Sequence, residues 1–215
     1  MARAPSFVGL ILAAGASLRM GSDKALLTWR GHTFLENHII ALNQHTDFVL
    51  VVAGSNYEKL EPLADAAGAF LIENAHPEAG QFSSMQVGLQ EVLNRGRDAA
   101  IVALVDRPPA APATLTLLRR SLIQAEPGIW AVVPEHAGLH GHPIVVAREM
   151  IGAFLAAPTT SNAREVMHAN QKHIRYLPVD DAFTIENINS VEDYERIRSQ
   201  AEASQKKSNS AQNRT

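Results

Sequence analysis

Residues 7–24 read Phe-Val-Gly-Leu-Ile-Leu-Ala-Ala-Gly-Ala-Ser-Leu-Arg-Met-Gly-Ser-Asp-Lys, and this stretch decides the fold. Its first half is an unbroken apolar run, which is typical of a strand buried on both faces of a sheet. Its second half is small, glycine-containing and basic. A loop of this kind after a strand leaves backbone N–H groups free to bind phosphate, and Arg19 and Lys24 add positive charge. A tight turn with incidental surface charges is the alternative interpretation.

The composition favours one soluble globular domain. The chain has 215 residues, of which 46% are hydrophobic, and this is enough for one well-packed core. A net charge of −3 gives no general attraction to nucleic acid or to a membrane surface. The chain has no cysteine, which excludes disulfides and thiolate chemistry. The first apolar run is too short to span a bilayer and is followed by no processing pattern, so we expect a cytoplasmic protein.

Strands and helices are predicted to alternate along the first two thirds of the chain. Beyond the first strand, strands are expected at residues 47–53, 69–72, 99–105, 129–133, 144–147 and 174–179. Helices are expected after Thr33, whose capping box with Glu36 marks a start, and at 57–67, 85–93, 113–124, 148–156, 161–169 and 191–203. This alternation predicts an α/β fold with a mostly parallel sheet and helices on both faces. We expect one domain over residues 1–204 and a disordered polar tail over 205–215.

Asp106 directly follows the buried strand predicted at residues 99–105. Ligands of such folds bind at the carboxyl ends of the strands, where a carboxylate suits a hard cation such as Mg²⁺. An ordinary turn residue is the alternative reading of this aspartate. His136, His140 and His142 lie close together, but no further zinc ligands are evident, and we do not expect a zinc site. The P-loop, dinucleotide-binding and nucleophile-elbow motifs are all absent from the sequence.

The first loop resembles the signature of a known family. Leu12-Ala13-Ala14-Gly15, followed by Arg19, Gly21 and Lys24, is similar to the loop of MobA-like nucleotidyltransferases, which have a three-layer αβα, Rossmann-like (GT-A-type) fold. The family includes molybdenum cofactor cytidylyl- and guanylyltransferases, methylerythritol phosphate cytidylyltransferases and sugar-phosphate nucleotidyltransferases. The resemblance implies that residues 12–15 wrap the base and triphosphate, and that Arg19 and Lys24 neutralise charge as pyrophosphate leaves.

A second segment extends the resemblance. Asn74-Ala75-His76-Pro77, with Gly80 to Met85, is similar to the family's N-P…G-M-S-S-S-L segment, although Phe82 replaces a residue that is often small. The resemblance implies nucleotide contacts by Asn74, Ser83 and Ser84. Ser83 and Ser84 also suit a helix N-cap pair, and the two roles are compatible.

Two further matches imply a magnesium site. Asp106-Arg107-Pro108 resembles the family's Asp-Gln-Pro or Asp-Met-Pro, and Arg107 departs from it by adding a positive charge that we expect near the phosphates. Residues 187–193, Asn-Ile-Asn-Ser-Val-Glu-Asp, resemble the pattern N-x-N-T-P-E-D. The resemblance implies that Mg²⁺ is bound by Asp106 and Asn189, with Asn187 nearby, since Mg²⁺ accepts carboxylate and amide oxygens. Asn189 or Ser190 also suits a cap of the last helix.

The resemblance also bears on the two substrates. Residues 138–143 are similar to the G-x-x-G-H-P segment of the cytidylyltransferase branch, which implies that Gly141, His142 and Pro143 contact the acceptor. Residues 160–164 are a looser match to its D-x-G-A-R segment. Ala14 and the stretch 179–181 favour CTP, whereas residues 20–27 also resemble the guanylyltransferase branch.

The resemblance, over residues 7–198, therefore implies an Mg²⁺-dependent transfer of a nucleoside monophosphate to a phosphate-bearing acceptor such as molybdopterin. Transient contact with a molybdoenzyme or another cofactor-pathway protein is a further expectation, and neither nucleic acid nor membrane is an expected partner. Four alternatives stay open: guanylyl transfer to molybdopterin, transfer to another acceptor such as a sugar phosphate, glycosyl transfer, and a non-catalytic nucleotide-binding regulator. Glycosyltransferases of this fold usually carry Asp-x-Asp where this chain has Asp106-Arg107-Pro108.

Overall fold

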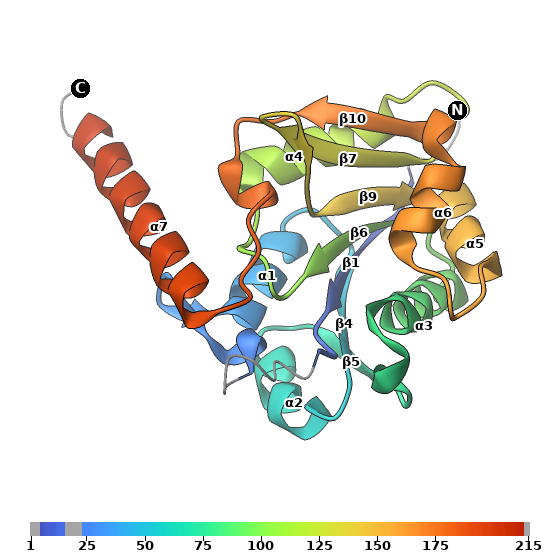
Figure 1. Ribbon diagram of the computed structural model, residues 1–215, viewed down its shortest axis with the longest axis horizontal. Coiled ribbons are helices and arrows are strands. Elements are labelled where there is room, and N and C mark those ends of the chain that lie inside the picture. Colours follow the sequence, from blue (N-terminus) through green and yellow to red (C-terminus); the bar gives the residue numbers. More distant parts are fainter. Residues whose placement is uncertain (1–4, 16–22, 213–215) are drawn as a thin grey trace.

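A twisted sheet forms the centre of the molecule (Figure 1). The computed structural model describes residues 5–15 and 23–212, with side chains up to residue 202. Within these residues, the sheet has the strand order β10-β7-β9-β6-β1-β4-β5, and β8 pairs with β7. Its strands are β1 (Phe7–Leu12), β4 (Phe48–Ala53), β5 (Phe70–Glu73), β6 (Ala99–Leu104), β7 (Ala131–His136), β8 (Leu139–His140), β9 (Ile144–Ala147) and β10 (Ile174–Pro178). A small hairpin, β2 (Thr28–Trp29) and β3 (His32–Thr33), lies outside it.

Most neighbouring strands are parallel, which confirms the predicted sheet. Strand β1 pairs in parallel with β4 and β6, β4 with β5, and β7 with β10. Strand β9 runs antiparallel to both β6 and β7. The chain first builds the β1-β4-β5 side and then crosses to β6 on the other side of β1. This reversal opens a crevice at the carboxyl ends of β1 and β6, where ligands of such sheets bind.

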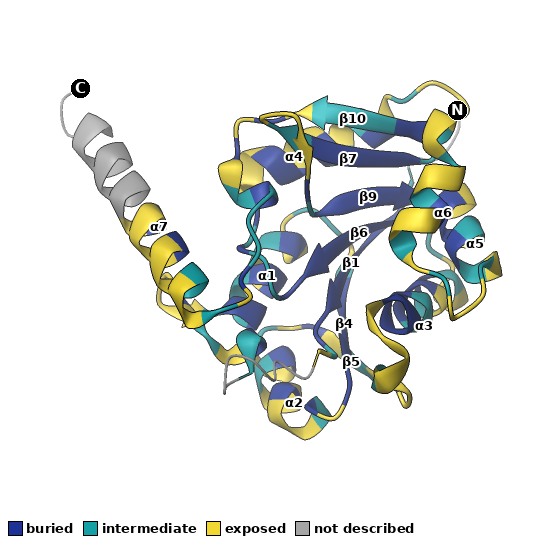
Figure 2. Ribbon diagram, in the orientation of Figure 1, coloured by how far each residue is buried: buried dark blue, intermediate teal, exposed yellow. Residues whose placement is uncertain are grey.

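Helices cover both faces of the sheet and complete three layers (Figures 1 and 2). One layer contains α1 (Phe34–Asn43), α2 (Tyr57–Ala66), α4 (Pro112–Ile123) and the start of α7 (Val191–Gln212), and the other contains α3 (Gln81–Asn94), α5 (Arg148–Ala156) and α6 (Ala163–Ala169). Strand β1 sends Phe7 and Ile11 to the first layer and Val8 and Leu10 to the second, as the alternation of a strand requires. The fold is therefore the predicted three-layer α/β fold.

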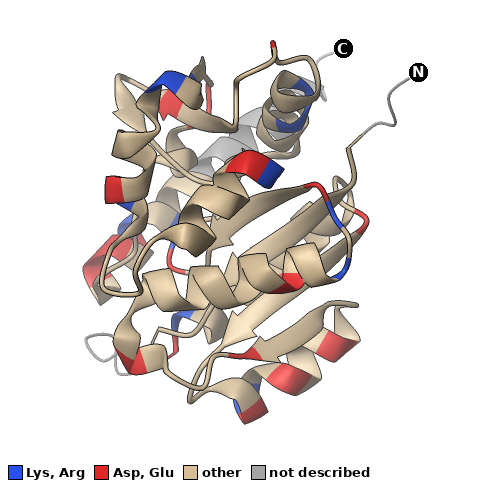
Figure 3. Cartoon of the chain, turned by 90° about the vertical axis from the view of Figure 1, so that its right-hand side faces the viewer, with Lys and Arg blue, Asp and Glu red and all other residues tan. Residues whose placement is uncertain are grey.

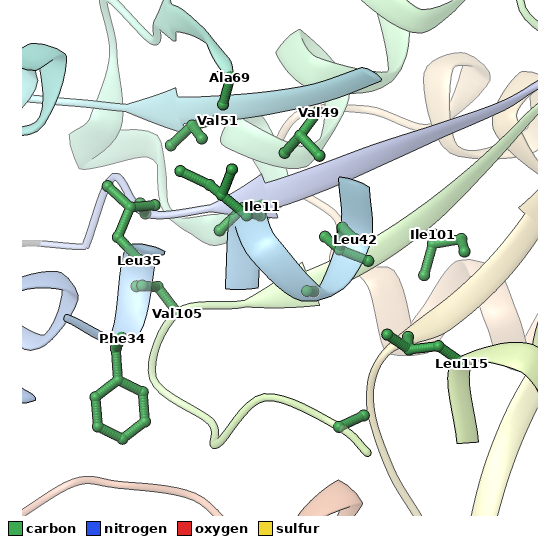
Figure 4. Packing of buried hydrophobic residues seen from close by; sticks show 14 of the residues in the cluster. Ile11, Phe34, Leu35, Leu42, Val49, Val51, Ala69, Ile101, Val105 and Leu115 are labelled. Carbon is green, nitrogen blue, oxygen red and sulfur yellow. The ribbon is translucent and has the colours of Figure 1, made fainter. Parts of the chain in front are cut away.

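Strand composition explains why the centre is buried. Strands β1, β4 and β6 contain no charged residue, whereas the charges of the helices lie on their outer sides (Figure 3). On the α1 side, Ile11 packs among Leu35, Leu42 and Val49 (Figure 4). The capping box at the start of α1 is confirmed, because Thr33 and Glu36 bind each other's backbone N–H groups.

Two helix ends differ from the prediction. Helix α3 begins at Gln81, four residues before the expected start at 85, because Pro77 to Ala79 form a short 3-10 turn and Gly80, with φ of 95°, is the N-cap. Ser83 and Ser84 consequently lie inside the first turn and are not an N-cap pair. Helix α7 continues to Gln212, so the tail expected to be disordered from residue 205 is helical to that point. Alanine, glutamine, lysine and glutamate predominate there, and all four have high helix propensity.

None of the helices in the described part of the chain combines the length and the apolar character that a membrane crossing requires.

Gly88 allows α3 to lie directly on the sheet. A Cβ atom at this position would overlap Leu10 Cδ1 of β1 and would lie 2.9 Å from Val52 Cγ2 of β4. Gly152 of α5 is also helical, but a Cβ atom there would meet nothing within 4 Å. The two glycines therefore separate the effect of packing from that of helix propensity.

We predict that Gly88→Ala lowers the free energy of unfolding by about 1 kcal/mol, since overpacking outweighs the helix propensity gained. The matched control Gly152→Ala should instead stabilise the protein by up to about 1 kcal/mol. Urea denaturation followed by circular dichroism measures both values. Equal stabilisation by the two substitutions would contradict the close contact of α3 with β1.

Candidate functional site

Two predicted segments meet at the carboxyl ends of β1 and β6. Leu12 of β1 is aligned with Leu104 of β6, and the Val105 N–H donates to the Leu12 carbonyl at 3.2 Å. Residues 13–15 continue from β1, and Asp106 follows β6 by two residues. The parallel pairing of the two strands thus places the first loop beside the predicted metal ligand.

Lys24, Asp106 and Asn189 come together at this crevice. Lys24 Nζ lies 3.8 Å from Asp106 Oδ2 and 3.4 Å from Asn189 Oδ1, although Asn189 is 165 positions away in the sequence. The Ile188 N–H donates to the Asp106 carbonyl at 2.9 Å, which holds the two chain segments together. The structure therefore assembles the three residues that the resemblance predicted to act together. Arg19, together with the rest of residues 16–22, lies outside the described residues.

The oxygen atoms at this point suit a hard cation. Asp106 Oδ1 and Asn187 Oδ1 are buried and have no hydrogen-bond partner. Leaving buried polar atoms unpaired is costly, and carboxylate and amide oxygens are ligands that Mg²⁺ prefers. Within the described residues, no three His, Cys, Asp or Glu side chains are grouped to hold a metal. A cation here would consequently bind one carboxylate and amide oxygens, and would complete its coordination with substrate phosphates and water.

A pocket of about 350 Å³ lies beside the first loop and is large enough for a nucleotide base and sugar. Its lining residues in the described part of the chain are Leu12, Ala14, Gly15, Ser55, Pro77, Glu78, Gly80, Gln81 and Ser84. Leu12, Ala14, Gly15 and Ser84 were predicted to bind nucleotide. The other residues come from the turns after β4 and β5, and no motif in the sequence distinguished them.

Ala13, Asn74 and Ser83 support this pocket from behind and do not line it. Ala13 is buried, and its N–H donates to the Val52 carbonyl at 2.8 Å. Asn74 is also buried, and its Nδ2 donates to Ser83 Oγ at 3.0 Å and to Ser84 Oγ at 2.9 Å. The structure thus gives Asn74 the role of joining the segment after β5 to the start of α3.

Asn56 is a site residue that the sequence analysis missed. Its Nδ2 donates to the Ala13 carbonyl at 2.9 Å and to Asp23 Oδ2 at 2.7 Å, while its Oδ1 accepts from the Gly54 N–H at 3.0 Å. One buried side chain therefore holds both ends of the first loop. The only signal in the sequence is the Gly54-Ser55-Asn56 turn that follows the strand next to β1.

The predicted acceptor segment packs against residue 184. The His142 N–H donates to the Thr184 carbonyl at 2.9 Å, and the peptide bond between His142 and Pro143 is cis. A Cβ atom on Gly141 would overlap the same Thr184 carbonyl oxygen, so only glycine fits there. Burial, and next the positive charge of Arg107, lower the pKa of His142 to about 3. His142 is therefore a neutral imidazole at physiological pH.

The other two histidines of this region have partners of their own. His136 Nδ1 lies 2.9 Å from the Val179 carbonyl oxygen, and His140 Nε2 lies 3.4 Å from Glu135 Oε2.

Arg107 has different partners from the phosphates expected for it. Its Nη1 donates to the Thr184 carbonyl at 3.2 Å and to the Glu186 carbonyl at 3.3 Å. Its own carbonyl oxygen lies 3.0 Å from His38 Nε2. A carbonyl only accepts, so His38 carries its proton on Nε2. Burial lowers the pKa of His38 to about 4, although the bond to Arg107 raises it slightly.

We predict that protonation of His38 makes folding pH-dependent. Its pKa is about 4 when folded and 6.5 as the reference, so the unfolded chain binds the proton first and stability falls as the pH drops from 6.5 to 4. His38→Gln keeps a donor for the Arg107 carbonyl but does not titrate. Between pH 7 and pH 4 the variant should therefore lose less stability than the wild type, by about 2–3 kcal/mol.

Urea denaturation at successive pH values measures this difference. His32→Gln, at an exposed histidine of β3, is the control and should follow the wild-type profile. Parallel profiles for His38→Gln and the wild type would show that His38 is not held neutral.

Comparison with known proteins adds to this geometry. The model of the MobA-like NTP transferase domain family matches residues 9–174 of the chain. This range includes the first loop, residues 74–84 and Asp106, but ends before the segment that carries Asn189.

Similar proteins cover nearly the whole chain. The molybdenum cofactor cytidylyltransferase of Escherichia coli (strain K12) is 25% identical over 186 residues, which are 86% of this chain and 92% of that protein. The molybdenum cofactor guanylyltransferase of Xanthomonas euvesicatoria pv. vesicatoria (strain 85-10) is 28% identical over 194 residues, or 89% of this chain and 94% of that protein. Among solved structures, the complex of Rv0371c from Mycobacterium tuberculosis H37Rv with manganese has a TM-score of 0.73 at 22% identity, over 90% of this chain and 98% of that chain.

Proposed function

Because this chain belongs to the MobA-like NTP transferase family and is a nucleotidyltransferase, we propose that it transfers a nucleoside monophosphate from an NTP to a phosphate-bearing acceptor, with release of pyrophosphate. We propose CTP as the favoured nucleotide and molybdopterin as the acceptor. The relatives named above support the acceptor, since both carry molybdenum cofactor in their names. They differ in the nucleotide, so the preference for CTP rests on Ala14 and the His142-Pro143 segment.

The meeting of Lys24, Asp106 and Asn189 beside the pocket is the observation that carries this proposal. An oxygen of the acceptor phosphate attacks the α-phosphorus of the NTP, and the bond to the β-phosphate oxygen breaks as pyrophosphate leaves. Lys24, together with Arg19, stabilises the negative charge on the departing group. Mg²⁺ held by Asp106 and Asn189 would supply further charge neutralisation on the phosphates. The manganese in the Rv0371c complex supports a divalent cation in this fold.

The two substrates are assigned to two sides of Asp106. We propose that residues 12–15, Asn74, Ser83 and Ser84 form the nucleotide side, directly or by supporting the pocket, and that Gly141, His142 and Pro143 face the acceptor. The buried, neutral His142 adds no charge there, which suits an acceptor recognised through groups other than a protonated imidazole. We further propose that the protein acts in the cytoplasm and meets a molybdoenzyme or another cofactor-pathway protein transiently.

We predict that Lys24→Ala lowers the rate of pyrophosphate release by at least about 100-fold, because a cation aimed at developing charge is lost. The fold should survive, since Lys24 lies in a short surface turn, Lys24–Leu26. The control Lys59→Ala removes an exposed lysine of α2 and should keep the wild-type rate. The assay measures pyrophosphate from each NTP with Mg²⁺ and molybdopterin.

The same assay separates the alternatives. Wild-type pyrophosphate release by Lys24→Ala would reject the assignment of the site. A preference for GTP would make the chain a guanylyltransferase, and turnover only with a sugar phosphate would change the acceptor. Nucleotide binding without turnover of any acceptor would favour a regulator, and hydrolysis of a nucleotide sugar would favour glycosyl transfer.

A further inference from the structure

The proposed cation site is built from two parts of the chain that have no covalent reason to stay together. Asp106 follows β6, whereas Asn187 and Asn189 lie in residues 184–189, which we call the linker segment, between a short 3-10 turn and α7. One backbone bond, from the Ile188 N–H to the Asp106 carbonyl at 2.9 Å, joins them directly. The relative position of carboxylate and amide oxygens therefore depends on what else holds the linker segment.

Arg107 supplies the remaining bonds from the β6 side. Its Nη1 donates to the carbonyls of Thr184 and Glu186, which stand at alternate positions of the linker segment. The guanidinium is planar and rigid, so it fixes the direction of both carbonyls as well as their distance. Together with the bond at Ile188, these contacts hold the linker segment at three successive alternate residues.

The main chain and the first acceptor of Arg107 are themselves immobilised. The Arg107 carbonyl oxygen is bound by His38 of α1, and the Thr184 carbonyl also accepts from the His142 N–H. Thr184 is fully buried, and its hydroxyl donates to the Asp181 carbonyl at 2.7 Å. A displacement of the Arg107 side chain would thus leave buried carbonyls without a donor, which is costly.

We propose that Arg107 is a positioning residue that holds the linker segment against β6 and so keeps Asn187 and Asn189 beside Asp106. The inference rests on the proposed function, because it concerns the cation site of that reaction. It gives a physical role to the residue at which this chain departs from the family's Asp-Gln-Pro or Asp-Met-Pro pattern. Arg107 touches neither nucleotide nor acceptor in this role.

The test compares Arg107→Met, which removes the donors but keeps an unbranched side chain, with Arg107→Lys, which keeps the charge. Arg175→Met is the matched control, because Arg175 is also half-buried and also donates to a main-chain carbonyl, that of Ser121, but joins β10 to α4. The first readout is amide hydrogen exchange over residues 185–189 of the full chain without metal. The second is the affinity for Mn²⁺ alone, measured by electron paramagnetic resonance.

We expect Arg107→Met to exchange at least about 10-fold faster over the linker segment and to bind Mn²⁺ about 10-fold more weakly, as for other residues that orient metal ligands. Arg107→Lys should lie between Arg107→Met and the wild type, because it donates from a single point without the planar fork. Arg175→Met should match the wild type in both readouts. Excess Mg²⁺ should restore the turnover of Arg107→Met, which a general loss of stability would not allow.

Wild-type exchange over the linker segment in Arg107→Met overturns the proposal, and so does wild-type Mn²⁺ affinity despite faster exchange. Equal effects of Arg175→Met also overturn it, because the cause is then a general loss of stability. If Arg107→Met does not fold, Arg107→Lys decides by the same two readouts. Failure of the proposed function is seen separately, as a wild-type protein that binds Mn²⁺ but releases no pyrophosphate.

Discussion

The parallel pairing of β1 with β6 is the constraint on which the site depends. The two strands are aligned from Phe7 opposite Ala99 to Leu12 opposite Leu104, and both are buried on both faces. Parallel strands end at the same edge of a sheet, so a loop that follows one and a carboxylate that follows the other must lie side by side. A shift of register by one residue would turn the apolar side chains of β1 from one helix layer to the other. The core therefore fixes the distance between the nucleotide pocket and Asp106.

The last quarter of the chain completes what this pairing begins. After β9 runs back beside β6, the chain forms β10 at the edge of the sheet and then returns to the crevice through residues 184–189. This return brings Asn189 to Lys24 across almost the full length of the sequence. The catalytic surface is thus closed by contacts between distant segments, in which main-chain carbonyls are as important as side chains.

Local patterns in the sequence predict the elements well because their causes are local. The apolar run of β1 and the capping box of Thr33 and Glu36 depend only on neighbouring residues, and the structure confirms both. The start of α3 is misjudged because the turn at Pro77 and the left-handed Gly80 create an N-terminus without a capping side chain. The full length of α7 is also misjudged, since a polar composition suggests disorder although the same residues favour a helix.

The candidate site is predictable only where a family pattern supplies the long-range information. Lys24, Asp106 and Asn189 are recognised in this way, and the structure brings them together. Asn56 and the partners of Arg107 are not predictable, because their bonds run to main-chain atoms of distant segments that no spacing in the sequence reveals.

The side chain of Asn56 has a consequence for how tightly a nucleotide binds. By holding Ala13 and Asp23 at once, it closes the first loop before any ligand arrives. The entropy lost in bringing the ends of a loop together is then a part of folding and not of binding, and a ligand gains affinity when its site is organised in advance. Affinity for the nucleotide is therefore set partly by a buried amide behind the pocket, whose contribution is made while the pocket is still empty of substrate.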